Sequence, residues 1–389
     1  MRVVMNGLAA LKPKTGVGHY VARLHAAMGE AVSLYPGEKL GHIITRLQNR
    51  VQSKSNPKPG DDRRRGVNDL KNLLKHLGKT AVGLHFAKHC QVHNYDLYHE
   101  PNFIPFSTQL PTVITVHDLS VLLHPEWHPA DRAKHHDRHF VPAVRRARHV
   151  IAVSREVRRE LIAHLGVRSE KVTAIHNGVG NEFRPHTERE VDAARHRLKL
   201  PARYFLCVGT IEPRKNLLTV LKAFADLPAK MRRHCPLVLA GPWGWKSEPE
   251  REFLAAHPDG VIALGYAAAA DLPALYAGSA ALLYPSHYEG FGLPPAEALA
   301  CGTRVVASRT CAAVREVVGP HGTFVETTDI PAWREVLKSI ASDRDILKTG
   351  SGIAHARQFT WQRAADETLQ VYREVLGIAR PNQTLRSAA

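Results

Sequence analysis

The sequence has 389 residues, of which 44% are hydrophobic and 23% charged, and it carries a formal net charge of +17 at pH 7. This length is enough for two domains of ordinary size, and the composition is that of a globular chain. No run of about 18 apolar residues occurs, which excludes a membrane-spanning helix, and the N-terminal stretch lacks the unbroken apolar core of a signal peptide. We therefore expect the protein to stay in the cytoplasm.

The strong positive charge predicts an anionic partner. Nucleic acid, an anionic membrane surface and phosphorylated substrates each attract such a chain, whereas a generally basic proteome would explain the charge without any partner. The sequence has neither zinc-finger spacing nor an aromatic RNA-binding motif, so we expect no nucleic acid and favour peripheral binding to the inner face of the cell membrane. The five cysteines, odd in number and without metal-type spacing, argue against disulfides and a zinc site.

The N-terminal stretch combines an apolar run with a glycine pair. We interpret residues 2–5 as a strand, followed by a basic loop. Gly16 and Gly18 lie between that loop and a helical pattern that begins at Tyr20. A glycine pair between a strand and a helix can admit a phosphate.

Residues 37–80 are the least regular part of the sequence. Residues 54–66 are typical of a loop, and residues 70–79 place four leucines between lysines, as in a short basic amphipathic helix. Such a helix either lies on an anionic bilayer or covers the N-terminal sheet with its charges in water. For the basic segment 39–79 the sequence supports the two interpretations equally.

A histidine follows the next pair of expected strands, which lie within 95–105 and over 111–116. Ligands of open α/β sheets bind at the carboxyl ends of strands, so His117 stands where an imidazole can contact a sugar or transfer a proton. Ser154 is expected to cap a helix after the strand that precedes it. The remaining elements expected here are a basic helix and two strands, over residues 129–150, 150–153 and 172–175.

A second α/β unit follows the charged helix expected over 188–198. Its first strand, 204–208, leads into a loop that carries Arg214 and Lys215, and a helix follows over 217–227. A cationic pair at that place can neutralise a diphosphate. Further strands are expected over residues 237–241, 261–265, 280–284, 304–307 and 323–325. Because strands and helices alternate, we expect parallel sheets.

The stretch 284–308 combines a glycine loop with two carboxylates. Gly290 and Gly292 follow a buried strand, and a proline pair suits the first turn of a helix over 295–300. This arrangement offers free amides and a positive dipole end to an anion. Glu289 and Glu297, separated by seven residues, would then accept hydrogen bonds from hydroxyl groups. The pattern predicts a nucleotide sugar, although Glu297 alone is equally typical of a plain helix-start acid.

This stretch resembles the signature of retaining glycosyltransferases of family 4, the glycosyl transferases group 1, which have the GT-B fold. The sequence EGFGLPPAE, residues 289–297, carries the family's pair of glutamates at its spacing. VGTIEPRKNL, residues 208–217, and TVHDLS, residues 115–120, match further family segments. HPEWHP, residues 124–129, is similar to bacterial mannosyl- and rhamnosyltransferases of surface-polysaccharide pathways, and this favours a GDP-mannose-dependent mannosyltransferase.

The resemblance implies a role for each matching position. His117 and Glu289 would contact the donor sugar in catalysis, and Glu297 would hold the ribose. Gly16 and Gly18 would lie at the floor of the cleft, on the acceptor side. The resemblance implies no metal and no cofactor besides the nucleotide-sugar donor. The donor diphosphate would face Arg214, Lys215, Gly290, Phe291, Gly292 and Leu293.

We therefore expect an α/β protein of the GT-B class, with two Rossmann-like domains whose parallel sheets face each other across a cleft. Residues 1–182 would bind the acceptor, residues 183–362 the nucleotide sugar, and the helix within 363–389 would return to the first domain. The expected reaction transfers a sugar, with mannose favoured, to a hydroxyl of a glycan or polyprenyl-diphosphate-linked acceptor in lipopolysaccharide or exopolysaccharide biosynthesis.

Several alternatives stay open at this point. The donor could be a UDP-sugar, or the enzyme could be a GT-B nucleotide-sugar epimerase or a phosphorylase. A nicotinamide-dependent dehydrogenase would need a third glycine where the sequence has Val21. A basic membrane- or nucleic-acid-binding protein without activity would use the charge alone.

Overall fold

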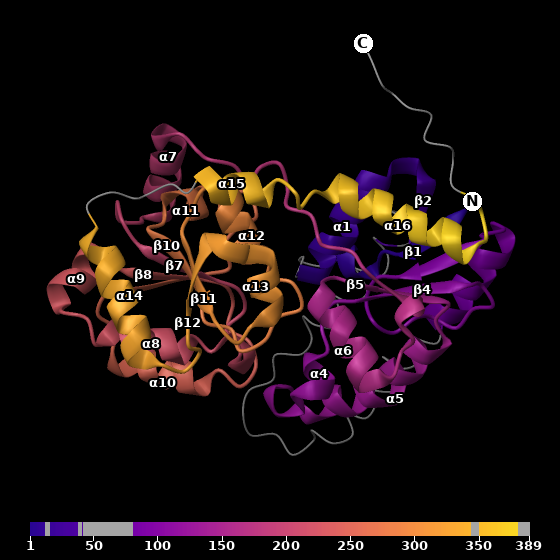
Figure 1. The fold of residues 1–389 in the computed structure, drawn as a ribbon, viewed down its shortest axis with the longest axis horizontal. Helices are drawn as coiled ribbons and strands as arrows, with labels where there is room; N and C mark the ends of the chain where they lie inside the picture. Colours follow the sequence, from indigo (N-terminus) through magenta and orange to yellow (C-terminus); the bar gives the residue numbers. More distant parts are fainter. Residues whose placement is uncertain (12–15, 38–40, 42–80, 344–349, 380–389) are drawn as a thin grey trace, which may run out of the picture.

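The computed structural model describes residues 1–11, 16–37, 41, 81–343 and 350–379, and all structural statements below concern these residues. The chain forms two lobes that lie side by side, each built on a six-stranded parallel sheet (Figure 1). The predicted α/β class with parallel sheets is therefore confirmed. The basic amphipathic helix predicted within segment 39–79 lies outside the described residues.

The first sheet has the strand order β2-β1-β3-β4-β5-β6. Neighbouring strands run parallel, with Val3 level with both Val32 and Leu97. Most of its residues are buried, as expected for strands covered by helices on both faces. The strands are β1 (Val3–Asn6), β2 (Val32–Tyr35), β3 (Leu97–Glu100), β4 (Thr112–Val116), β5 (His149–Ala152) and β6 (Val172–Ala174).

The second sheet has the order β12-β11-β10-β7-β8-β9. Its central strands β7, β8, β10 and β11 are almost wholly buried and form the core of the second lobe with helices on both faces (Figure 1). The strands are β7 (Phe205–Val208), β8 (Leu237–Ala240), β9 (Val261–Gly265), β10 (Ala281–Tyr284), β11 (Val305–Ser308) and β12 (Gly322–Val325).

Helices connect the strands, and several begin at the side-chain caps that the sequence offers. Ser154 accepts a hydrogen bond from the amide of Val157, and Thr187 forms a capping box with Glu190. A further helix covers residues 81–92. Helices of the first lobe are α1 (Gly16–Met28), α4 (Ser120–Leu123), α5 (Ala130–Arg146) and α6 (Arg155–Leu165). Those that follow are α7 (Glu188–Leu198), α8 (Leu217–Ala225), α9 (Ala229–His234), α10 (Glu248–Ala256), α11 (Leu272–Gly278), α12 (Leu293–Ala300), α13 (Ala312–Val318), α14 (Ile330–Ser342), α15 (Gly350–Ala356) and α16 (Trp361–Val375). Short 3₁₀ turns are η1 (Leu8–Leu11), η2 (Gly29–Ala31), η3 (Pro125–Trp127), η4 (Ser169–Lys171), η5 (Pro213–Lys215) and η6 (Gly319–His321).

The structure differs from the sequence-based expectation in three places. Helix α1 begins at Gly16 rather than Tyr20, so the glycine pair occupies its first turn and not a loop. The segment between the strands expected over 304–307 and 323–325 contains α13, a helix that was not predicted, whose buried Val314, Val317 and Val318 recur at helical spacing. Strand β2 was not predicted, because it has only four residues and an exposed serine within them.

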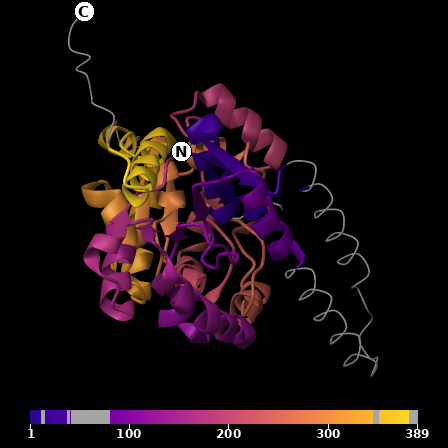
Figure 2. The same ribbon diagram turned by 90° about the vertical axis from the view of Figure 1, so that its right-hand side faces the viewer.

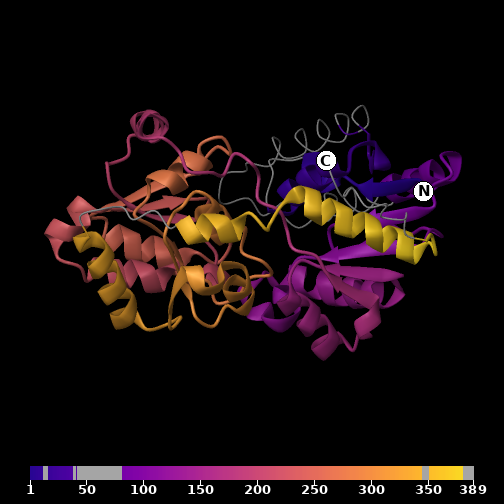
Figure 3. The same cartoon turned by 45° about the horizontal axis from the view of Figure 1, so that its top comes forward.

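Helix α16 crosses from the second lobe and packs against α1 of the first (Figures 1 and 3). The hydroxyl of its Tyr372 lies 2.6 Å from Nδ1 of His99 in the middle of the first sheet. The crossing runs beside the outgoing connection, since Val179 forms a parallel bridge with Thr360. The expected return of the last helix is thus confirmed, whereas the boundaries at 182 and 362 stay predictions.

The two lobes touch through apolar and polar contacts between α6 and α13 and between neighbouring loops. Phe291 and Val317 of the second lobe join an apolar cluster with Phe140 and Val157 of the first. The indole nitrogen of Trp245 donates to the carbonyl oxygen of Trp127 at 2.8 Å. Figure 2 views this assembly end-on, with the first lobe in front. The carboxyl ends of the two sheets are thereby brought close together.

Candidate active site

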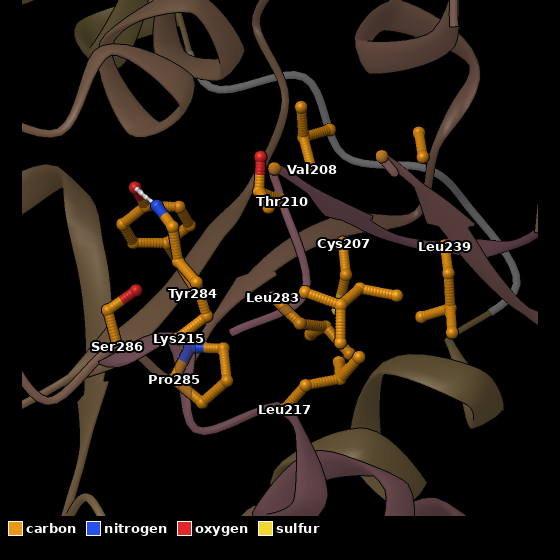
Figure 4. A pocket seen from close by; sticks show the side chains of 14 residues that line it. Cys207, Val208, Thr210, Lys215, Leu217, Leu239, Leu283, Tyr284, Pro285 and Ser286 are labelled. Carbon is orange, nitrogen blue, oxygen red and sulfur yellow. Dashed lines mark hydrogen bonds between the residues drawn. The ribbon is translucent and has the colours of Figure 1, made fainter. Parts of the chain in front are cut away.

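A crevice opens where the strand order of the second sheet reverses direction. The chain moves outward from β7 to β8 on one side and from β10 to β11 on the other, so the neighbours β7 and β10 form the switch point. Ligands of open α/β sheets bind outside the carboxyl ends of strands at this point. A hollow lies there, lined by Gly209, Gly241 and Tyr284 among others. Figure 4 shows Lys215 beside Tyr284 at its edge.

The predicted cationic pair lies in η5, directly after β7, and both members bind Glu289. Nη1 of Arg214 donates to Oε2 of Glu289 at 2.6 Å, and Nζ of Lys215 donates to Oε1 at 2.6 Å. Lys215 also donates to the hydroxyl of Tyr284 at 2.8 Å, and Arg214 to Glu212 at 2.7 Å. The structure therefore brings together three site residues that lie up to 75 positions apart in the sequence.

The charges of this cluster are strongly coupled. Burial alone would raise the pKa of Glu289, but the positive charges of Arg214 and then Lys215 outweigh it and lower the pKa to about 2. Burial lowers the pKa of Arg214, yet the charges of Glu289, Asp118 and Glu212 raise it well above its usual value. Glu289 and Arg214 are consequently ionised at neutral pH. Glu289, expected to bind sugar hydroxyls, binds the two cations here.

The loop after Glu289 presents its backbone rather than its side chains. Gly292 has φ +98°, a left-handed conformation that favours glycine, and it is the N-cap of α12. The ring of Phe291 is buried and packs on His176 and Phe359 at centroid distances of 5.8 and 5.7 Å. Leu293 begins the helix and packs into the same cluster. Only main-chain amides of this loop can therefore contact a phosphate, as the helix-start arrangement requires.

His117 follows β4 at its carboxyl end, and its backbone carbonyl lies against Gly290 of the second lobe. Its Nε2 donates to the carbonyl oxygen of Pro101 at 2.8 Å, which leaves Nδ1 as the nitrogen able to accept a proton or hydrogen bond. Burial lowers the pKa of His117, so the imidazole is neutral at pH 7. The ring of Tyr20 on α1 meets it edge-on at 4.8 Å, and Gly16 and Gly18 lie in the first turn of the same helix.

Glu297 has a different environment from Glu289. Its Oε2 accepts a hydrogen bond from the hydroxyl of Tyr276 at 2.9 Å, and burial raises its pKa to about 7. The charges of Glu182 and Arg23, which pair with each other at the connection between the lobes, act on it more weakly. Glu297 thus lies near the connection between the lobes, whereas Glu289 lies next to η5.

Sequence reasoning overlooked several residues around this cluster, Asp118 and Tyr288 among them. Asp118 faces Arg214, whose charge lowers the pKa of this carboxyl against the effect of burial, and its Oδ1 accepts from the hydroxyl of Ser120 at 2.7 Å. Its position directly after His117 at a strand end was the available signal. Tyr288 binds the first lobe through its hydroxyl. No pattern in the sequence marked it.

The described part of the chain shows neither a metal site nor a membrane-spanning helix. No group of three or more potential ligand residues is arranged to hold a metal ion there. Within the same residues, no helix combines the length and apolar character needed to cross a bilayer. The expectation that no metal is required stays a prediction.

Comparisons with known proteins agree with this geometry. The family model described as Glycosyltransferase Family 4 matches residues 16–183, and the one described as Glycosyl transferases group 1 matches residues 188–351. O-antigen chain mannosyltransferase B of Escherichia coli is 31% identical over 375 residues, which are 93% of this chain and 96% of that protein. The serotype-specific mannosyltransferase WbdA of Escherichia coli is 27% identical over 278 residues, 68% of this chain and 34% of that protein.

Solved structures are similar over nearly the whole chain. Sucrose-phosphate synthase from Thermosynechococcus elongatus superposes with a TM-score of 0.71 at 19% identity, covering 97% of this chain and 99% of that one. Anabaena HepE in complex with UDP and glucose gives a TM-score of 0.68 at 18% identity, with 96% and 99% covered. These likenesses confirm the GT-B fold.

The matches fit a glycosyltransferase better than an epimerase, a phosphorylase, a dehydrogenase or a binding protein without activity. They imply a nucleotide sugar as the donor and a glycan as the acceptor. With both family models matched in order and a relative at 31% identity over almost the full length, the chain belongs to the family 4 glycosyltransferases.

Proposed function

We propose that this chain is a retaining mannosyltransferase that moves mannose from GDP-mannose to a hydroxyl of a bacterial surface polysaccharide. The observation that carries the choice of sugar is the 31% identity, over almost the full length of both chains, to an O-antigen chain mannosyltransferase. HepE is described in complex with UDP and glucose, but its 18% identity concerns the fold alone. A UDP-sugar is therefore the donor against which the proposal is tested.

The proposed reaction depends on charge that develops on the leaving diphosphate. Arg214, Lys215 and the amides of the loop from Gly290 to Leu293 stand at the switch point, where a donor diphosphate would lie. Fixed cations and amides that face a developing negative charge lower the barrier, because they need no reorganisation during the reaction. We expect this step to require no metal.

The hydroxyl-binding roles follow from the remaining site residues. His117 and Glu289 would contact the donor sugar, and Glu297 the ribose. No carboxylate is assigned as a covalent nucleophile, so we propose attack on the same face as departure, with the leaving phosphate accepting the proton of the acceptor hydroxyl. Gly16 and Gly18, in the first turn of α1 beside His117, would border the acceptor.

The acceptor is proposed to be a growing glycan, held on a polyprenyl diphosphate at the inner face of the cell membrane. The formal charge of +17 supports this, because a basic surface is attracted to anionic lipid and to diphosphate. Vesicle co-sedimentation with anionic and with neutral lipid measures this attraction directly. Equal binding to both vesicle types would count against it.

The first experiment screens GDP, UDP, ADP and TDP and their common sugars by thermal shift. A ligand that binds only the folded state raises the melting temperature. We expect the largest rise with GDP and GDP-mannose, followed by transfer of mannose with retained anomeric configuration. A response to UDP alone would keep the enzyme class and overturn mannose.

Lys215→Ala tests the diphosphate site. A hydrogen bond from a charged group contributes about 1.5–3 kcal/mol, so the affinity for the nucleoside diphosphate should fall roughly 10- to 100-fold. Isothermal titration calorimetry measures this value. Lys222→Ala, at an exposed position of the adjacent α8, is the matched control and should bind like the wild type. Equal affinities in the two variants would remove Lys215 from the site.

A further inference from the structure

Helix α6 carries none of the predicted site residues, yet the signature loop of the second lobe binds it. The hydroxyl of Tyr288 donates to Oε2 of Glu160 on α6 at 2.5 Å. The same hydroxyl accepts a hydrogen bond from the backbone amide of Leu119 at 3.0 Å. Tyr288 and Glu160 lie 128 positions apart and on different lobes. One hydroxyl therefore joins the second lobe to two separate elements of the first.

These contacts lie directly beside the two residues proposed for catalysis. Tyr288 precedes Glu289, and Leu119 follows His117 by two positions. Gly290 completes the contact, since a Cβ added there would collide with the carbonyl oxygen of His117. The backbone of residues 288–290 is thus packed onto that of residues 117–119. Any shift of the Tyr288 hydroxyl would move Glu289 relative to His117.

Both side chains of the Tyr288–Glu160 contact are buried, and the Tyr288 hydroxyl both donates and accepts a hydrogen bond. Tyr288 is 9% exposed and Glu160 is 8% exposed. Burial raises the pKa of Tyr288 well above its usual value, so the hydroxyl keeps its proton and can donate. It donates once and accepts once, which fixes its direction within the pocket between α6 and the loop after β4. A buried hydroxyl that lost these partners would incur a desolvation penalty.

A second contact from the second lobe also binds α6. Glu316 of α13 accepts hydrogen bonds from the amides of Arg155 and Glu156, at 3.0 and 3.1 Å, and so caps the first turn of α6. Oε1 of Glu316 also lies 2.5 Å from Nε2 of His176. The second lobe therefore binds α6 at two points, at its first turn through Glu316 and near its middle through Tyr288.

We propose that Tyr288 is a positioning residue for glycosyl transfer, which sets Glu289 against His117 by inserting its hydroxyl between Glu160 and the amide of Leu119. This inference rests on the proposed roles of Glu289 and His117. Tyr288 acts through its neighbours and needs no contact with the substrate. Binding of the nucleoside diphosphate depends on Arg214, Lys215 and the loop amides, so it should not require this hydroxyl.

The test compares Tyr288→Phe with Tyr204→Phe. Both remove one buried hydroxyl, but Tyr204 donates to the carbonyl oxygen of Leu275 within the second lobe. A misplacement of about 1 Å can cost a hundredfold in rate, so we expect kcat of Tyr288→Phe to fall on the order of 10- to 100-fold. Its Kd for the nucleoside diphosphate should change much less than kcat, since Arg214, Lys215 and the loop amides all remain. Tyr204→Phe should lose melting temperature with kcat unchanged.

Substitutions of Glu160 test the same hydrogen bond from its other partner. Glu160→Gln keeps an oxygen that accepts from Tyr288 and should retain most of kcat, whereas Glu160→Leu should behave like Tyr288→Phe. The double variant Tyr288→Phe/Glu160→Leu should be no slower than the slower single variant, because either substitution alone already breaks the contact that the two residues share. A further drop in kcat that equals the product of the two single effects would show that the residues act independently.

Hydrogen exchange gives a readout that does not depend on turnover. The amide of Leu119 should exchange faster in Tyr288→Phe than in the wild type, because it loses its acceptor. Kinetics use whichever nucleotide sugar the wild type accepts, so failure of GDP-mannose alone would overturn the proposed donor and leave this test intact. Wild-type kcat in Tyr288→Phe, a matched loss of nucleotide affinity, or unchanged exchange at Leu119 would each overturn the positioning role.

Discussion

Glu289 neutralises both cations that the proposed donor diphosphate would contact. Each of its oxygens binds one of them, Arg214 and Lys215, at 2.6 Å. A phosphate that binds there must therefore compete with a carboxylate of the protein. Release of that carboxylate would leave it free to accept hydroxyls of the sugar. The donor itself would in this way prepare the residue that binds its sugar.

Glu289→Gln separates these two effects. We expect transfer to be lost, while the affinity for the free nucleoside diphosphate rises by roughly tenfold, because the competing charge is gone. Stability should fall, since two buried cations lose their partner. Calorimetric titration and a thermal melt of the same variant measure both changes. Weaker nucleotide binding would show that Glu289 does not compete with phosphate.

Glu297→Gln should reveal the raised pKa of this carboxyl through stability. The folded state keeps the proton up to about pH 7, against 4.5 for the unfolded chain, so wild-type stability falls as the pH rises from about 4.5 to 7. Glutamine lacks this titration. Relative to the wild type, the variant should gain up to about 3 kcal/mol across that interval and nothing more above it. Denaturant melts at pH 5 and pH 8 measure the difference, and a constant offset would contradict the raised pKa.

The sequence allowed the types of site residue to be predicted but not their partners. Arg214, Lys215 and Glu289 were recognised from motif and loop position. Their mutual binding was not, because it depends on how two loops from different strands meet at a sheet edge. The bond between Tyr288 and Glu160 left no local signal at all, since neither residue interrupts the pattern of its own element.

The loop before α12, together with the first turn of α12, is a part of the second lobe that packs against the first lobe. Gly290 has no room for a side chain, because the His117 carbonyl of the opposite lobe occupies that space. Gly290→Ala should therefore push the lobes apart and abolish transfer, while each lobe keeps its own core. Small-angle scattering should give a larger radius of gyration than for the wild type. Gly166→Ala, with φ +62° but open space around the added Cβ, is the control and should change stability without changing the radius.

Prediction of elements succeeded where one pattern dominated a segment. Strands β7 to β11 were found as short apolar runs between turn residues, and α7 was found from its charged helical pattern. The start of α1 at Gly16 was not expected, because glycine is a poor helix former. Gly16 is exposed, and Gly18 is the buried member of the pair. Helix α13 was missed because seven residues give too few turns for a clear period.

At the scale of the whole molecule, the last helix stabilises the first lobe. Tyr372 is fully buried, and its hydroxyl binds His99, which also binds Thr115 at 2.8 Å. Tyr372→Ala should cost about 3–5 kcal/mol, the usual effect of removing a large aromatic side chain from a core. Hydrogen exchange should quicken in β1, β3 and β4 and stay unchanged in β7 and β8. Equal acceleration in both sheets would indicate that the lobes unfold as one unit.

The two chain segments that connect the lobes lie side by side, which affects how the gene could be recombined. The chain leaves the first lobe near Val179 and re-enters it near Thr360, and the amide of Val179 donates to the carbonyl oxygen of Phe359 at 2.9 Å. The second lobe is therefore an insertion whose two ends meet. The second lobe of a relative could be exchanged through two neighbouring splice points, provided that Gly178 is kept, because a side chain there would strike the backbone of Trp361. If the second lobe binds the donor as proposed, new donor preferences could arise by such exchange while the first lobe stays intact.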